Sequence, residues 1–355
     1  MSRLSNTELS QLDDRTLERL VHSDPTDDRP RRILVDRYFS RADFTKALDL
    51  LDQVMASLMD VPADVLYKKA ESLGLLGRCT EAVPLFKAAI LLVGPDPKSA
   101  EELDMAAMSH YNLSTMLPLG EAEQHVAPAL RYLEALLARY PDCEEQHIVA
   151  SYIGELYLAR GDLSAAIVAY NRAADLCEKP EERIWTQVGL ASVYREQGDH
   201  ELAEKRYRDA LVAPPENGCS RIHFEFGKLL LAAGRLQEAR EAFGAALVSR
   251  EKSPPLLANP LYLADILWHL GSVTYQQSDI EETIHHLEQA LPLISRDHAY
   301  FANSHVTLGH CYAARSDYPK AREHYNLAVF APLGSDEEIE VAQRCLKDIG
   351  EAGTA

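Results

Sequence analysis

Residues 154–173 read GELYLARGDLSAAIVAYNRA, and their order of small, bulky and turn-forming residues recurs along most of the chain. A glycine opens the stretch, Tyr157 follows three positions later, and Gly161-Asp162 marks a turn. Its second half carries alanine, tyrosine and alanine at spacings of four and three: Ala166, Tyr170 and Ala173. Because such spacings fall on one helical face, the stretch predicts two helices joined by a tight turn.

Eight copies of this pattern occur along the chain. The residue that opens the second half of each copy is alanine in seven of them and threonine in one: Ala47, Ala82, Ala129, Ala166, Ala203, Ala239, Thr283 and Ala321. A regular order repeated at this period is typical of a solenoid, in which each unit packs only on its neighbours. We therefore expect an all-α, right-handed superhelical solenoid of about eight stacked helix hairpins without strands.

The glycines and the turns have separate roles in this prediction. Glycine allows two helices to cross closely, and the bulky residue of the second helix then fills the adjoining gap; the clearest such glycines are Gly154, Gly227, Gly271 and Gly309. In the turns, a left-handed residue ends one helix and a polar residue helps to begin the next. These turns are Ala42-Asp43, Gly77-Arg78, Gly161-Asp162, Gly198-Asp199, Gly234-Arg235, Ser278-Asp279 and Ser316-Asp317.

Together the small residue, the aromatic and the paired alanines resemble the tetratricopeptide repeat, over residues 28 to 333. The copy that begins at Ala191 also ends on proline, at Pro214-Pro215. Two departures stand out. The leading tryptophan of the family is replaced in every unit, by Leu66, Ala150, Gln187, His223, Leu267 or His305, and the third unit (about 100–141) has an insertion that hides its small residue.

The pattern divides the chain into five segments. Residues 1–27 form an N-terminal capping helix and linker, 28–251 the first six units, and 264–333 the last two. Residues 252–263, which contain Pro254-Pro255 and Pro260, form either a long loop or a hinge between two sub-arrays. Residues 334–355 form a C-terminal capping helix and tail.

Both end segments carry the signature of a helix start. Ser5 with Glu8, and Ser335 with Glu338, each fit a capping box. The last helix is expected to end at Gly350 and to cover the final repeat with one apolar face: Ile339, Ala342, Leu346 and Ile349.

Composition limits the classes of function. A formal net charge of -19 argues against nucleic-acid binding as the main activity, since phosphate contacts need clustered Lys and Arg. The six cysteines lie far apart and indicate a reducing compartment: Cys79, Cys143, Cys177, Cys219, Cys311 and Cys345. The polar N-terminus does not resemble a signal peptide, and no apolar run is long enough for a membrane span. We expect a cytoplasmic protein.

Motifs that would indicate catalysis are missing from the sequence. There is no GxxxxGK[ST] phosphate loop, and neither HExxH nor GxSxG occurs. His285 and His286 are adjacent, and His305 and His310 are five apart, so neither pair shares a helical face. We therefore expect no metal, no cofactor and no enzymatic activity.

The first helix of each unit should line the concave side of a solenoid. On these helices the candidate binding residues are Trp185, Arg195, Arg221, Phe224, Lys228, Trp268, Tyr275, Asn303 and His310. Aromatic and arginine side chains are enriched at binding hot spots. The alternative is that Trp185 and Trp268 pack between repeats. The first two units offer a mixed set, and the fourth offers only Ser151 and Glu155.

These residues favour a non-enzymatic scaffold whose groove binds a peptide segment of a partner protein, either anionic or C-terminal. Alternatives are a peptide-sensing regulatory receptor, as in bacterial tetratricopeptide proteins, or an accessory subunit of an enzyme complex. The carboxylate clamp of chaperone-binding relatives is not reproduced. Glu225 lies one turn from Arg221, and Gly189 and His269 occupy positions where asparagine would be wanted.

Overall fold

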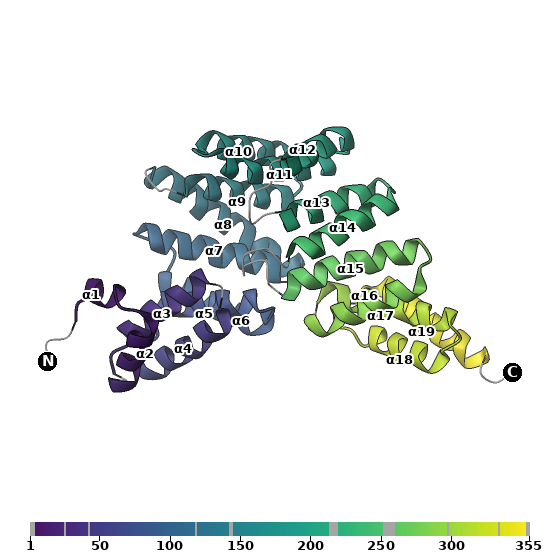
Figure 1. Ribbon diagram of the computed structural model, residues 1–355, viewed down its shortest axis with the longest axis horizontal. Coiled ribbons are helices and arrows are strands. Elements are labelled where there is room, and N and C mark those ends of the chain that lie inside the picture. Colours follow the sequence, from purple (N-terminus) through teal and green to yellow (C-terminus); the bar gives the residue numbers. More distant parts are fainter. Residues whose placement is uncertain are drawn as a thin grey trace. The chain divides into compact units, whose positions relative to one another are not determined.

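The computed structural model describes residues 4–24, 26–41, 43–117, 119–141, 145–212, 219–250, 260–296, 298–332 and 334–352. Within these residues the chain contains nineteen α-helices, one short 3₁₀ helix and no strand. It divides into two compact units, unit 1 with α1 to α11 and unit 2 with α12 to α19, and each is described by itself (Figure 1). The all-helical prediction is confirmed.

Sixteen of the helices follow one another as eight pairs along the chain, and each pair corresponds to one predicted repeat. The helices of unit 1 are α1 (Asn6–Ser10), α2 (Asp14–Ser23), α3 (Arg29–Ser40), α4 (Phe44–Ser57), α5 (Ala63–Leu75), α6 (Cys79–Val93), α7 (Ala100–Met116), α8 (Leu119–Arg139), α9 (Gln146–Ala159), α10 (Leu163–Leu176) and α11 (Pro180–Glu196). Those of unit 2 are α12 (His200–Val212), α13 (Cys219–Ala232), α14 (Leu236–Arg250), α15 (Pro260–Gln276), α16 (Ile280–Ala290) with its 3₁₀ extension Leu291–Leu293, α17 (Ala299–Ala314), α18 (Tyr318–Val329) and α19 (Asp336–Ala352).

The hydrophobic core of each unit consists of clusters shared by consecutive helices rather than one central core. In unit 1 a cluster around Leu34 and Ala47 joins α1 to α4, and a larger one from Leu103 to Ala173 joins α7 to α10. In unit 2 a cluster around Leu308 and Tyr325 joins α16 to α19. This arrangement is the packing expected of stacked repeats.

The turn within a hairpin has the geometry that the sequence predicts. Gly161 has a φ of 73°, and the Asp162 amide donates to the Tyr157 carbonyl (2.9 Å), which closes α9. The Asp162 side chain in turn accepts from the Ala165 amide (3.0 Å) and begins α10. One aspartate therefore ends one helix and starts the next. Ser278 and Ser316 occupy the glycine position of their turns with φ of 62° and 63°.

The repeated glycines lie where two helices of a hairpin cross. A Cβ added to Gly154 would lie 2.9 Å from the ring of Tyr170, one on Gly227 would lie 2.7 Å from Phe243, and one on Gly271 would lie 2.7 Å from Leu287. The same Cβ on Gly309 would meet the ring of Tyr325. Because carbon atoms in contact need roughly 3.5–4.0 Å, a side chain at these positions would force the facing ring or leucine to move.

The third repeat, whose small residue could not be placed from sequence, is a hairpin of α7 and α8. The insertion lengthens α8 to 21 residues. Ala129 and Leu133 are fully buried, as their places in the pattern predict, and Ala107 and Ser109 are the fully buried small residues at the middle of α7.

Helices that cap the repeats are present at both ends. Two short helices, α1 and α2, stand where one was expected, and Ser5 and Glu8 form the predicted capping box. At the other end the Glu338 amide donates to Ser335 Oγ (3.2 Å), and α19 packs on α17 and α18 with Ala342 fully buried. The prediction that the last helix ends at Gly350 was wrong, because α19 continues to Ala352.

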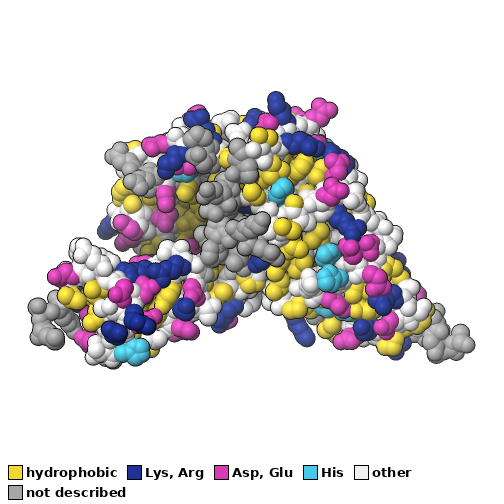
Figure 2. Space-filling model, viewed as in Figure 1, with side chains coloured by type: hydrophobic (Ala, Val, Ile, Leu, Met, Phe, Trp, Pro, Cys, Tyr) yellow, Lys and Arg dark blue, Asp and Glu magenta, His cyan; other side chains and the backbone are white. Residues whose placement is uncertain are grey.

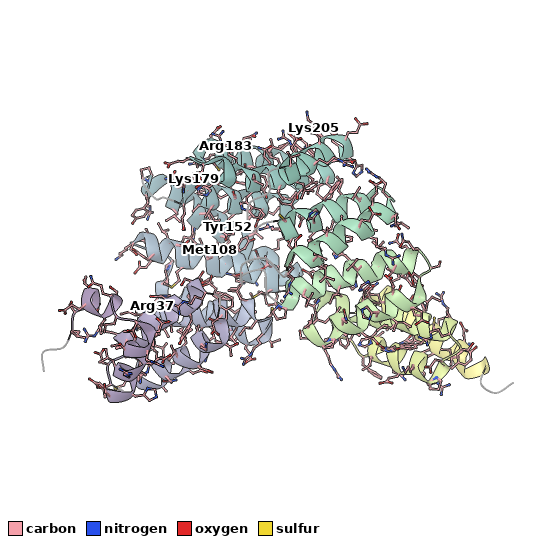
Figure 3. All side chains as sticks on the ribbon, in the orientation of Figure 1. Arg37, Met108, Tyr152, Lys179, Arg183 and Lys205 are labelled. Carbon is pink, nitrogen blue, oxygen red and sulfur yellow. The ribbon has the colours of Figure 1, made fainter. Side chains whose placement is uncertain are left out.

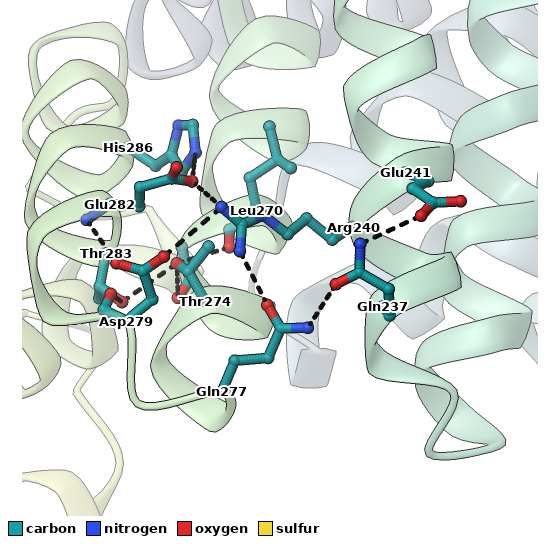
Figure 4. A network of polar contacts seen from close by, with 11 residues as sticks. Gln237, Arg240, Glu241, Leu270, Thr274, Gln277, Asp279, Glu282, Thr283 and His286 are labelled. Atoms are coloured by element: carbon teal, nitrogen blue, oxygen red, sulfur yellow. Dashed lines mark hydrogen bonds and ion pairs between the residues drawn. The ribbon is translucent and has the colours of Figure 1, made fainter.

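Polar contacts on the outer helices also connect successive repeats. In unit 2, Arg240 of α14 forms an ion pair with Glu282 of α16 (2.5 Å) and donates to Gln277 (3.2 Å) (Figure 4). Nearby, Thr283 donates to Thr274 (3.0 Å), so the threonine that replaces alanine in the seventh repeat is buried with its hydroxyl bonded. The Arg240 contacts join neighbouring hairpins, whereas the bond between the two threonines lies within the seventh hairpin.

Several sequence features lie outside the described residues: Ala42, Cys143, Pro214-Pro215 and Pro254-Pro255. Of the predicted loop or hinge at 252–263, residues 260–263 already belong to α15. The division between the two compact units falls at Asp199 and His200. The choice between a loop and a hinge at 252–263 stays a prediction. Within the described residues no helix is long and apolar enough to cross a membrane.

Candidate partner-binding surface

The first helices of three hairpins in unit 2 carry most of the predicted binding residues. Arg221, Phe224 and Lys228 lie on α13, Trp268 and Tyr275 on α15, and Asn303 and His310 on α17. Arg221 and Tyr275 are exposed, whereas the other side chains are half-buried or buried. On the face seen in Figure 2, hydrophobic side chains gather over α13 to α15 among charges of both signs.

Phe224 is the buried member of the predicted set. It is 7% exposed, and its ring packs edge-on against Tyr262 (centroids 5.5 Å apart) and His269 (5.0 Å). It also contacts Phe243, the ring that fills the space at Gly227. Phe224 therefore packs in the core beneath the surface, where its ring contacts hold α13 against α15.

Trp268 forms a stacked aromatic contact between α15 and α17. Its ring stacks on Tyr300 of α17 with centroids 4.2 Å apart and an interplanar angle of 8°. Both side chains are half-buried. Trp268 therefore packs between two repeats, as the alternative interpretation of the sequence predicted, and part of its side chain remains exposed.

Charges of both signs surround this aromatic pair. Lys228 forms an ion pair with Glu225 (2.8 Å) and lies over the Phe224 ring at 5.1 Å. Loss of hydration raises the pKa of Asp265 to about 6, with Lys228 opposing the rise and Glu225 adding to it. The surface therefore holds two cations, Arg221 and Lys228, and two carboxylates, rather than a basic patch.

Two tyrosines, Tyr262 and Tyr300, lie near these charged side chains, and the Tyr262 hydroxyl is 3.0 Å from Oγ of the buried Ser220. Loss of hydration raises the pKa of Tyr262 and of Tyr300 to about 12, so both stay neutral donors at physiological pH. Sequence reasoning missed Tyr262, Asp265 and Tyr300. Asp265 lies three residues before Trp268, so helical spacing from the tryptophan would have found it.

Tyr275 and His310 form a second contact on the same two helices. The Tyr275 hydroxyl and His310 Nδ1 are 3.1 Å apart, and Cys345 Sγ of α19 lies 3.7 Å from His310 Nε2. Tyr275 follows Trp268 by two helical turns, a rise of about 10 Å. The predicted residues of unit 2 thus form two groups, one around Trp268 and the other around Tyr275 and His310. Asn303 is half-buried on α17.

Trp185 and Arg195 belong to α11 in unit 1. Trp185 is half-buried, and the Arg195 side chain is 14% exposed and forms an ion pair with Glu196 (3.1 Å). The prediction that these two residues share a surface with α13 to α17 remains a prediction.

Two pairs of histidines lie within hydrogen-bond distance of each other, and we examined them as possible metal ligands. His110 and His125 face each other through their Nδ1 atoms at 2.9 Å, and so do His305 and His324. Burial, followed by the partner ring, lowers the pKa of His110 and of His305 to about 4. In the part of the chain that the structure describes, no group of three or more His, Cys, Asp or Glu could hold a metal ion.

Two models of tetratricopeptide repeats match the sequence, one over residues 145–213 and 262–329 and the other over 188–256 and 224–291. Their union runs without a gap from 145 to 329, more than half of the 355 residues. The chain belongs to the tetratricopeptide repeat family. This membership confirms the resemblance, and the hairpins before residue 145 extend the same architecture.

One of the similar solved structures, the first below, supports the fold. A chain of the APC/C hetero-tetramer Cut9-Hcn1 is 18% identical with a TM-score of 0.58, and the match covers 91% of this chain and 56% of that one. Pseudomonas aeruginosa pilF is 22% identical (60% and 88% covered, TM-score 0.49). YrrB, a TPR protein with an unusual peptide-binding site, is 16% identical (61% and 97% covered, TM-score 0.41). A comparison with curated sequences found no significant match.

Proposed function

We propose that this tetratricopeptide repeat protein is a non-enzymatic scaffold that binds a peptide segment of another protein on the first helices of its hairpins. The observation that carries the proposal is the stacked pair of Trp268 and Tyr300, which is half-buried and flanked by Lys228 and Asp265. Stacked aromatics with bonded charges beside them offer contact area, orientation and hydrogen bonds at small cost in side-chain entropy.

The predicted partner was an anionic or C-terminal segment, and this part of the proposal rests on Arg221 and Lys228. An anion at Lys228 must compete with Glu225, which already lies 2.8 Å from the ammonium group. Arg221 is exposed, so an anion can reach its guanidinium group from solvent. If the segment is anionic, Arg221→Glu together with Lys228→Glu should weaken binding about 30-fold or more, roughly 2 kcal/mol.

A cytoplasmic location is also part of the proposal. The described cysteines are free thiols: Cys79, Cys177, Cys219, Cys311 and Cys345. Free thiols are typical of a reducing compartment.

The scaffold proposal can be tested by selecting 12-residue peptides from a random phage library on the immobilised full chain. Peptides that bind the parent protein should lose about 30-fold in affinity for Trp268→Leu/Tyr300→Leu, because the hot-spot rings are gone. The control is Tyr318→Leu/Phe330→Leu, which alters two exposed rings at the ends of the outer helix α18. Failure to select any peptide, or equal binding to both double variants, would refute the proposal, provided circular dichroism shows both variants folded.

A further inference from the structure

A thiol, an imidazole and a phenol from three helices of unit 2 lie within hydrogen-bond distance of one another in a chain. Cys345 Sγ of α19 is 3.7 Å from His310 Nε2 of α17, and His310 Nδ1 is 3.1 Å from the Tyr275 hydroxyl of α15. Helix α17 contacts both α15 and α19, and the side chains of the three helices can be followed as sticks in Figure 3. We call these three residues the Cys–His–Tyr group.

Two tyrosine rings flank the imidazole of His310. The Tyr275 ring is stacked on it with centroids 6.3 Å apart and an interplanar angle of 22°. The Tyr325 ring of α18 packs edge-on with its centroid 5.7 Å away, and its side chain is 1% exposed. Because packing on two sides restricts the rotation of the imidazole, one ring nitrogen stays directed at Tyr275 and the other at Cys345.

The His310 imidazole is a proton acceptor at physiological pH. Burial, followed by the positive charge of Arg344, lowers the pKa of His310, so the ring is neutral there. A neutral imidazole has one N–H and one lone pair. When the Cys345 thiol donates to Nε2, the hydrogen of the ring is on Nδ1, which donates it to the Tyr275 oxygen. Nε2 can then take the thiol proton, and the Tyr275 oxygen stabilises the positive charge that results.

The sulfur of Cys345 can be reached from solvent. Cys345 and His310 are half-buried, and the Tyr275 side chain is 41% exposed. Cys311, which follows His310 in the chain, is in contrast 1% exposed, and burial raises the pKa of its thiol to about 11. A partly exposed sulfur beside a base that a third group orients is the arrangement of an activated thiol, whereas a buried thiol is inert. The two cysteines therefore differ in reactivity.

We propose that Cys345 is a modification site at which hydrogen peroxide oxidises the thiol to a sulfenic acid, with His310 as the base. The thiol proton moves to Nε2, and the sulfur attacks one oxygen of the peroxide. The S–O bond forms as the O–O bond breaks, so the sulfur gives two electrons to the peroxide. The leaving hydroxide takes the proton from His310 and becomes water, which returns the imidazole to its neutral form. This site is independent of the scaffold proposal.

The test treats the full chain with hydrogen peroxide and dimedone, which traps sulfenic acids, and follows the adduct at each cysteine by mass spectrometry of Glu-C peptides. Cys345 should form the adduct at least tenfold faster in the parent than in His310→Phe, which keeps a ring between the two tyrosines but has no base. Cys79 and Cys219, which are also half-buried, are internal references whose rates should change less than twofold. Tyr275→Phe should slow the reaction of Cys345 at least threefold, because it removes the oxygen that accepts from Nδ1.

The matched control is His285→Phe, which removes an exposed histidine from α16 of the same unit and should change the rate at Cys345 less than twofold. The dependence of the rate on pH separates a base from a residue that only holds the helices together. Between pH 6.5 and 8 the rate should rise no more than about threefold in the parent, because His310 takes the proton. In His310→Phe it should rise about tenfold or more, because only a thiol that has lost its proton to water reacts.

Three results would overturn the inference: no adduct at Cys345 in the parent, an equal rate in His310→Phe, or the same loss of rate in His285→Phe. Circular dichroism checks that each variant is folded. If His310→Phe does not fold, His310→Gln takes its place with the same expected loss, since an amide cannot accept the proton at these pH values.

Discussion

Tyr170 is held between two glycines, and replacing one of them measures how tightly the repeats pack. The Tyr170 side chain is 3% exposed and contacts Gly154 of its own hairpin and Gly189 of α11. In Gly154→Ala the new methyl carbon would lie 2.9 Å from ring carbon Cζ and 3.0 Å from Cδ1 and Cδ2. Since contact needs roughly 3.5–4.0 Å, the ring must retreat by about 0.5–1 Å, and Gly189 on the next helix opposes the movement.

The expected loss is the balance of two effects. Overpacking a core costs about 1–3 kcal/mol, and alanine in a helix interior is about 0.8–1 kcal/mol better than glycine. Gly154→Ala should therefore destabilise the protein by roughly 0–2 kcal/mol net. Gly244→Ala in α14 is the matched control, because a Cβ there meets nothing within 4 Å. It should stabilise by about 0.8–1 kcal/mol.

Urea unfolding followed by circular dichroism at 222 nm measures both variants. Their free energies of unfolding should differ by about 1–3 kcal/mol, since the helix-propensity gain cancels in the comparison and only the overpacking remains. Adding Tyr170→Leu to each variant should reduce this difference by at least half. The reasoning is refuted if the two alanine variants are equally stabilised, because Tyr170 would then not restrict the space at Gly154.

Two further predictions concern protonation and backbone conformation. The pKa of His305 is lowered to about 4 and that of His324 is lowered as well, both mainly by burial, so the unfolded chain binds more protons than the native one below about pH 6.5. The pair should therefore lose stability as pH falls from about 6.5 to 4. The difference in urea midpoint between parent and His305→Leu/His324→Leu should change over that range, and a constant difference would contradict the prediction. Ser278 and Ser316 have positive φ (62° and 63°), a conformation that is sterically unfavourable for any residue with a Cβ. Ser278→Gly and Ser316→Gly should therefore each stabilise the folded protein by about 0.5–1 kcal/mol. A melting temperature in calorimetry that is lower than that of the parent would contradict this prediction.

The helix hairpins could be predicted from the sequence because their contacts are between residues close together in the chain. Gly161, Asp162 and Tyr170 lie within sixteen residues of Gly154, and contacts at that range depend on helix period and turn geometry alone. For this reason the turn hydrogen bonds, the crossing at Gly154 and the capping boxes at Ser5 and Ser335 were predictable.

The insertion in the third repeat changed the spacing between its two helices, and the sequence prediction of surface residues depended on that spacing. With α8 lengthened to 21 residues, the fixed offset from Ala129 no longer locates the positions of α7. Asp104 and Tyr111 were therefore not recognised as surface residues, and the fourth unit looked bland although Glu155 accepts a hydrogen bond from Tyr111.

The proposed binding surface combines residues that only the tertiary structure brings together. Trp268 meets Tyr300 across 32 residues, because the surface combines residues from successive hairpins. Helical period assigns a side chain to a face, but the packing of the next hairpin decides whether it is covered, as it is for Phe224, or left half-exposed, as it is for Trp268. The sequence by itself determined the repeated hairpin, whose contacts are local. Only the stacking of the hairpins decided the charge and shape of each surface, because those depend on side chains a full repeat apart.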